Sequence, residues 1–122
     1  MEDEIYKENI LDRYRNPRWK KVIEDANIRE GGVNPSCGDA LIFFVKFGDN
    51  GSVEEASFDG EGCAISQSSA DILAENIESK SREEILSIDE KYVYNLLGVQ
   101  VGIAREKCAT LALNALRQGL KK

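Results

Sequence analysis

Three cysteines are the residues of this sequence whose chemistry is most distinctive: Cys37, Cys63 and Cys108. They are 26 and 45 residues apart, so the sequence lacks the closely spaced cysteine pairs of a zinc ribbon. An odd number of cysteines excludes a closed set of internal disulfides. The sequence contains no histidine, which excludes imidazole ligands from this chain. A four-ligand metal site would therefore take its fourth ligand from a carboxylate, a water molecule or a partner.

Each cysteine lies near a predicted boundary between elements, in a context that suits ligand chemistry. Cys37 lies in a polar loop at residues 34–39 (NPSCGD), which also contains Asp39. In an extended segment, side chains two residues apart point to the same side, so both could reach one ion. Cys63 and Cys108 lie near predicted helix starts, where a helix N-terminus favours a thiolate. We therefore expect lowered pKa values for all three thiols.

A different interpretation of the cysteines has to be kept open. A free cysteine is often a small buried hydrophobic residue, and Cys108 lies on the apolar face of its predicted helix. Composition and spacing alone thus indicate a soft-metal or thiol-chemistry site. They leave open a non-catalytic binding module in which the cysteines only fill the core.

The composition limits the classes of partner. The chain has 122 residues, of which 42% are hydrophobic and 31% charged, and its net charge is −6. An acidic domain lacks the clustered basic residues that contact phosphates, so we expect no nucleic-acid partner. No apolar stretch approaches the roughly 20 residues that span a bilayer, and the charged N-terminus is not a signal peptide. We expect a single domain, residues 1–122, that works in the cytoplasm, where thiols stay reduced, without a membrane partner.

The pattern of the first half predicts one helix followed by a small sheet. A helix should end at Asn16-Pro17, because the residue before a proline avoids the helical conformation. A weakly patterned edge strand should end at Gly31-Gly32, and turn-forming residues 48–51 (GDNG) should join a hairpin. The predicted helix covers residues 3–15, and the predicted strands cover residues 22–31, 40–47 and 53–58.

The second half changes to helical periodicity after Gly60. Ser81 and Glu84 have the spacing of a capping box that opens a short helix. Gly98 and Gly119 are expected helix stops. The three longer helices are predicted over residues 64–79, 89–97 and 103–118. The order of elements favours an α+β fold, with a small three-stranded antiparallel sheet and helices packed on one face.

Three segments, in this order and at this spacing, resemble the U-type iron–sulfur cluster scaffold family, which includes IscU, SufU and the N-terminal domain of NifU. The segments are residues 34–39 (NPSCGD), 60–66 (GEGCAIS) and 105–109 (REKCA), and residues 6–17 are similar to the family's opening. The resemblance implies an α+β fold and a scaffold function. Such a scaffold accepts sulfur from a cysteine desulfurase, builds a [2Fe-2S] cluster and passes it to downstream apo iron–sulfur proteins.

The resemblance also implies the site residues. Carried over residue by residue, the ligands are Cys37, Cys63 and Cys108, with Asp39 at the family's aspartate position. The IscU branch has a histidine where this chain has Lys107. It also has a proline-rich motif that a dedicated chaperone binds, whereas residues 95–104 contain no proline. The resemblance therefore does not imply chaperone-driven cluster transfer.

Two motifs are more similar to the SufU branch, namely residues 60–63 (GEGC) and 105–108 (REKC). SufU proteins usually carry an insertion between the second and third cysteines, and the 45-residue gap here is too short for it. SufU-like proteins hold zinc on three cysteines and the aspartate. They act as zinc-dependent sulfur acceptors that stimulate a cysteine desulfurase. Zn²⁺ accepts such a tetrahedral ligand set.

Two functions thus follow from the resemblance. The first is a non-enzymatic scaffold that carries a transient [2Fe-2S] cluster, and the alternative is a zinc-dependent sulfur acceptor of the sulfurtransferase type. Cys37 is the expected persulfide acceptor, because Gly38 should make its loop mobile, and Cys108 belongs to the same site. Lys107 or Arg105 could steer a sulfur anion, unless both lie on a solvated helix face. The sequence leaves homo-oligomer formation open.

Overall fold

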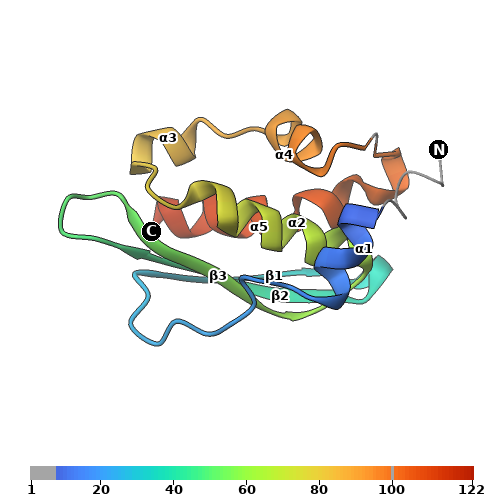
Figure 1. The fold of residues 1–122 in the computed structure, drawn as a ribbon, viewed down its shortest axis with the longest axis horizontal. Helices are drawn as coiled ribbons and strands as arrows, with labels where there is room; N and C mark the ends of the chain where they lie inside the picture. The colour runs from blue at the N-terminus through green and yellow to red at the C-terminus, as the bar shows by residue number, and fades with distance from the viewer. Residues whose placement is uncertain (1–7, 100) are drawn as a thin grey trace.

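The computed structural model describes residues 8–99 and 101–122 and shows helices covering one face of a three-stranded antiparallel sheet of order β1-β2-β3 (Figure 1). This confirms the predicted α+β class. Among the described residues, no helix is both long and hydrophobic enough to cross a membrane. The elements are α1 (Glu8–Arg15), β1 (Ile28–Asn34), the short 3₁₀ helix η2 (Pro35–Cys37), β2 (Asp39–Phe47), β3 (Val53–Glu61), α2 (Ala64–Ile77), α3 (Arg82–Leu86), α4 (Glu90–Leu97) and α5 (Ile103–Lys121).

The core lies between the sheet and the two long helices, α2 and α5. Phe43 and Phe58 pair across β2 and β3, and both are fully buried. Phe44 points to the opposite face because side chains alternate along a strand. It is also buried, and the Arg29 guanidinium lies 5.1 Å from its ring centroid. Two residues before Phe44, Ile42 is 39% exposed. The outer face is therefore covered at Phe44 but not at Ile42, near the η2 end.

The predicted hairpin is confirmed, but its return strand is longer than expected. β3 continues past Phe58 to Glu61, and Gly60 pairs with Leu41. Gly60 has φ 118°, and a Cβ there would collide with the Ala40 carbonyl oxygen. Only glycine accepts both conditions without strain. This continued pairing delivers the chain directly to Cys63, at the start of α2.

The edge strand was predicted incorrectly at both ends. β1 begins at Ile28 and runs through Gly31-Gly32 to Asn34, because these glycines keep their pairing with Ile42 and Leu41 of β2. The pairing uses backbone groups, so two missing side chains do not interrupt it.

The helix ends were predicted with mixed success. α1 ends at Arg15, as expected, while the predicted residues 3–7 lie outside the described part of the chain. The Ser81 capping box and the Gly98 stop are confirmed. Gly119 does not end α5, which continues to Lys121. This glycine lies inside the helix because the helix packs directly against Ile28 of β1 there and leaves no room for a side chain. α2 ends at Ile77, two residues early.

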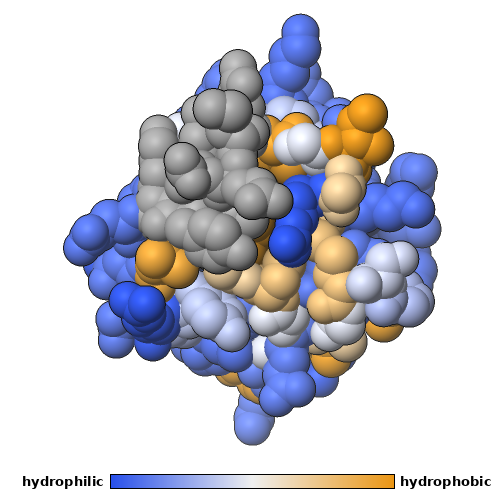
Figure 2. Space-filling view, turned by 90° about the vertical axis from the view of Figure 1, so that its right-hand side faces the viewer, coloured by the Kyte–Doolittle hydropathy of each residue, from blue (hydrophilic) through white to orange (hydrophobic). Residues whose placement is uncertain are grey.

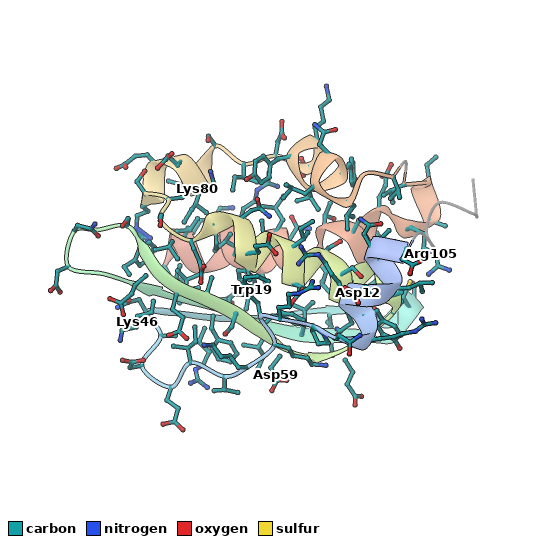
Figure 3. The ribbon with its side chains drawn as sticks, viewed as in Figure 1. Asp12, Trp19, Lys46, Asp59, Lys80 and Arg105 are labelled. Carbon is teal, nitrogen blue, oxygen red and sulfur yellow. The ribbon has the colours of Figure 1, made fainter. Side chains whose placement is uncertain are left out.

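A buried carboxylate joins α1 and the segment after it to α2. Asp71 is fully buried, and its Oδ2 accepts a hydrogen bond from Arg13 Nη1 at 2.8 Å. Its Oδ1 accepts from the backbone N–H groups of Arg18 at 2.9 Å and Trp19 at 2.8 Å. Arg13 Nη2 also donates to Glu75 at 2.7 Å. Trp19 is thereby held beneath α2, as Figure 3 shows.

We predict that Asp71→Ala destabilises the fold. The change leaves the largely buried Arg13 without its main partner and two backbone donors unpaired, so we expect a loss of about 3 kcal/mol. Urea denaturation of the metal-free protein measures it. Asp12→Ala is the control, because its ion pair with Arg18 is half-exposed and should contribute only about 0.5 kcal/mol. Equal losses in the two variants would show that the buried network does not hold this region.

Candidate metal centre

The end of the sheet next to η2 positions the first cysteine. β1 ends at Asn34 and β2 begins opposite it at Asp39, and η2 closes the connection between them. Gly38 has φ 68° and donates its N–H to the Pro35 carbonyl at 3.3 Å. Cys37 is therefore in a tight turn. The expectation that an extended segment aligns Cys37 with Asp39 is wrong, although the two residues do lie together.

Cys37, Asp39 and Cys108 converge from three different elements. One ligand atom from each lies within 4.8 Å of the others. Cys37 Sγ and Cys108 Sγ are 2.8 Å apart, and Asn34 Nδ2 donates to Cys108 Sγ at 3.5 Å. Cys108 is fully buried, whereas Cys37 is partly exposed. Two sulfurs and one carboxylate oxygen thus face one point at the end of the sheet.

The two oxygens of Asp39 have different environments. Oδ1 accepts hydrogen bonds from Cys63 N at 2.8 Å and Ser66 Oγ at 3.1 Å. Oδ2 is buried and has no hydrogen-bond partner among the described residues. A buried, unpartnered carboxylate oxygen is costly unless a cation compensates it. The donor set and this unpartnered oxygen therefore fit a bound metal.

Cys63 lies beside this group without joining it. It is the N-cap of α2, and its Sγ accepts from Ser66 N at 3.4 Å. The predicted position at a helix N-terminus is confirmed. The Cys63 backbone is tied to Asp39, yet its Sγ is not among the three atoms that lie within 4.8 Å of one another. Cys63 and Cys37 line the same pocket of about 590 Å³.

The expected lowering of the thiol pKa is wrong for Cys108. Burial is the main cause that raises the pKa of its thiol, and its hydrogen bond with Cys37 and its electrostatic interactions with Cys63 and Asp39 raise it further. Cys108 is in the second turn of α5, where the effect of the helix terminus has faded. A bound cation would reverse this balance, because a coordinating thiol is deprotonated.

The two basic candidates lie in different places. Arg105 is partly buried in the first turn of α5, at the same end of the molecule as α1 (Figure 3). Lys107 is exposed and lines a separate depression beside Asn34 and Pro35. Neither of these two residues lines the pocket that Cys37 and Cys63 share.

Four polar side chains of the cysteine pocket were not predicted from the sequence, namely Tyr14, Lys20, Glu61 and Gln67. Gln67 had a usable signal, because it lies four residues after Cys63 and thus on the same face of α2. Lys20 had none, since it belongs to an irregular segment. Its place depends on backbone pairing with Phe58 of β3, which local patterns do not predict.

The sequence is similar to proteins of iron–sulfur cluster assembly. It is 36% identical to the zinc-dependent sulfurtransferase SufU of Bacillus subtilis, over 98% of this chain and 92% of that protein. It is 35% identical to the iron–sulfur cluster assembly scaffold protein IscU of Thermotoga maritima, over 97% and 94%. The Bacillus alignment extends over 137 positions, more than the 122 residues of this chain, so SufU has residues without a counterpart here.

Two solved structures and a family model support the same relationship. A putative iron–sulfur cluster assembly scaffold protein for the SUF system from Fervidobacterium islandicum has a TM-score of 0.80 at 30% identity, covering 95% of this chain and 96% of that one. A NifU-like N-terminal protein from Brucella abortus has a TM-score of 0.78 at 18% identity, covering 98% and 94%, and so shares the fold. The family described as the NifU-like N terminal domain matches residues 5–122. This chain belongs to that family of iron–sulfur cluster assembly domains.

Proposed function

We propose that this protein is an iron–sulfur cluster assembly scaffold that holds a transient [2Fe-2S] cluster, its cargo, on Cys37, Asp39, Cys63 and Cys108. The observation that carries the proposal is the convergence of two cysteine sulfurs on a buried aspartate whose Oδ2 has no partner among the described residues. The scaffold name of the Thermotoga relative supports it.

The mixed ligand set suits a cargo site. Thiolates are the usual ligands of iron–sulfur clusters, and an oxygen ligand at one corner binds iron less firmly. Asp39 also ties the backbone of Cys63 to the site through Oδ1. A rotation of the Cys63 side chain would then add the third sulfur without moving α2. The site can thus hold a cluster and release it.

A zinc-dependent sulfur acceptor is the alternative. The observation that favours it is the similarity to the Bacillus sulfurtransferase SufU. Three cysteines and one aspartate also match the tetrahedral preference of Zn²⁺, with the same four residues as ligands. Bound zinc would supply charge that keeps the thiols deprotonated. The two functions therefore share one site and differ in what it carries.

Sulfur delivery would start at Cys37. Its side chain is partly exposed, whereas Cys108 is fully buried. The Cys37 thiolate attacks the outer sulfur of a persulfide on a cysteine desulfurase, a new S–S bond forms, and the donor cysteine leaves as a thiolate. Arg105 or Lys107, in the first two turns of α5, would attract the incoming anion from outside the pocket, because neither lines it.

The partners would meet the molecule at this end. Figure 2 shows hydrophobic residues interrupting a mostly hydrophilic surface here. Val33, next to η2, is 69% exposed, and Ile103, at the start of α5, is 87% exposed. Such apolar side chains beside a site suit protein contact. We propose that a desulfurase and the apo proteins that receive the cluster bind here, and that residues 1–122 act as one domain in the cytoplasm.

Asp39→Asn should lower zinc affinity at least about ten-fold. The change replaces a negatively charged carboxylate ligand by a neutral amide, which attracts the cation less strongly. The amide oxygen can still accept from Cys63 N and Ser66 Oγ, so the local fold should survive. Competition with a chromophoric chelator measures the affinity. Asp59→Asn, on β3 outside the ligand group, is the control with the same charge change. Equal affinities for both variants and the unaltered protein would remove Asp39 from the ligand set.

Anaerobic reconstitution with iron, cysteine and a cysteine desulfurase should give the visible absorbance of a [2Fe-2S] cluster. Separate Cys37→Ser, Cys63→Ser and Cys108→Ser changes should each greatly reduce that absorbance, because each removes a thiolate ligand. Far-UV circular dichroism checks that the variants are folded. If no cluster forms under reducing conditions, while the zinc-loaded protein accelerates desulfurase turnover, the zinc alternative replaces the scaffold proposal.

A further inference from the structure

The pocket beside Cys37 and Cys63 has a wall that none of the proposed ligands provides. Lys20 and Gln67 lie on this wall, and Glu61 and Tyr14 complete the side chains that can form hydrogen bonds. The described residues give Gln67 and Lys20 one direct contact, from Lys20 Nζ to Gln67 Oε1 at 3.1 Å. This contact joins two segments that are far apart in the sequence, at the point where the pocket meets α2.

Gln67 carries a donor that has no acceptor. Its side chain is 4% exposed, and its backbone N–H donates to the Cys63 carbonyl at 3.0 Å, one turn earlier in α2. Because a lysine ammonium only donates, the amide oxygen must face Lys20. The amide nitrogen therefore points elsewhere, and Nε2 is buried without a partner among the described residues. Gln67 lines the pocket, so an anion bound there would supply the acceptor that this buried donor lacks.

Lys20 is held in place although its side chain is exposed. Phe58 N donates to the Trp19 carbonyl at 3.1 Å, and Lys21 N donates to the Phe58 carbonyl at 2.9 Å. The backbone of Lys20 is thus fixed on both sides. Its ammonium lies 5.9 Å from the Phe58 ring centroid. The positive charge is therefore held at the pocket by its backbone, by an aromatic ring and by Gln67.

We propose that Lys20 and Gln67 form an anion subsite of the cysteine pocket, which holds the anionic sulfur carried on Cys63 or Cys37. A fixed positive charge and an unpaired N–H donor are the two features that an anion needs. That the anion is sulfur rests on the proposed function, whereas the preference for an anion does not. The exposed Glu61 carboxylate works against this preference, so its removal should strengthen it.

The test compares two alkylating reagents on the reduced, metal-free full chain. Iodoacetate is an anion and iodoacetamide is neutral, and both form an S–C bond with the cysteine thiolate while iodide leaves. Because the same thiolate reacts with both, the ratio of the two rates cancels its pKa and its accessibility. Peptide mass spectrometry gives this ratio separately for Cys37 and Cys63.

Lys20→Met should lower the iodoacetate-to-iodoacetamide ratio at Cys63 or Cys37 about three-fold, as expected for one charge near a partly hydrated pocket. Gln67→Met should lower it in the same direction, and Glu61→Gln should raise it. Lys21→Met is the matched control. It removes the same charge from the next residue, whose side chain pairs with Glu55. Its ratio should stay unchanged.

The proposal is overturned if Lys20→Met leaves the ratios unchanged, or if Lys21→Met lowers them equally. Lys20 is exposed, so its replacement keeps the fold even if the buried Gln67 cannot be replaced.

Sodium tetrasulfide then tests whether the bound anion is sulfur, since a thiolate takes one sulfur from tetrasulfide and releases trisulfide. After the tetrasulfide is removed, an added thiol takes the outer sulfur and the cysteine leaves as a thiolate. This transfer should be several-fold faster from Lys20→Met than from Lys21→Met, and equal rates would reject sulfur as the anion. None of these readouts requires cluster assembly, so failure of the scaffold function is seen separately.

Discussion

The carboxylate of Asp39 is the group on which the site depends, because its two oxygens have separate tasks. Oδ1 accepts hydrogen bonds from Cys63 N and Ser66 Oγ, and so it attaches the start of α2 to the start of β2. Oδ2 is buried and has no hydrogen-bond partner among the described residues, in a carboxylate that lies beside Cys37 and Cys108. The glycine between β3 and α2 permits this arrangement, because a Cβ at Gly62 would lie 2.6 Å from Asp39 Oδ1. One oxygen thus organises the fold, and the other remains available to a cation.

Helix α2 connects the candidate metal centre to the N-terminal part of the described chain. Side chains four residues apart lie on one face of a helix. On α2 this face contacts first the metal centre, then Lys20, then Arg13 and the backbone after α1. The cysteine pocket and the docking of α1 therefore share one polar stripe. The members of this stripe are Cys63, Gln67, Asp71 and Glu75.

Much of the fold and of the site could be predicted, because the relevant signals are local. The hairpin turn, the capping box before α3 and the position of Cys63 as an N-cap all follow from short motifs. The remaining features depend on contacts between distant residues. The apolar helix face indicated that Cys108 is buried, but the sequence did not show that Cys37, Cys63 and Asp39 lie close enough to raise the pKa of its thiol further. Lys20 reaches the pocket only because its segment pairs with β3.

The central claim is that three cysteine sulfurs and one oxygen of Asp39 bind the metal. Zinc K-edge X-ray absorption of the zinc-loaded protein tests it most directly, because it counts the atoms bonded to the ion. The account predicts three sulfurs at about 2.3 Å and one oxygen at about 2.0 Å. The Asp39→Asn protein should keep the three sulfurs, with a change confined to the oxygen. A zinc ion bound mainly by oxygen or nitrogen, with fewer than three sulfurs, would contradict the account.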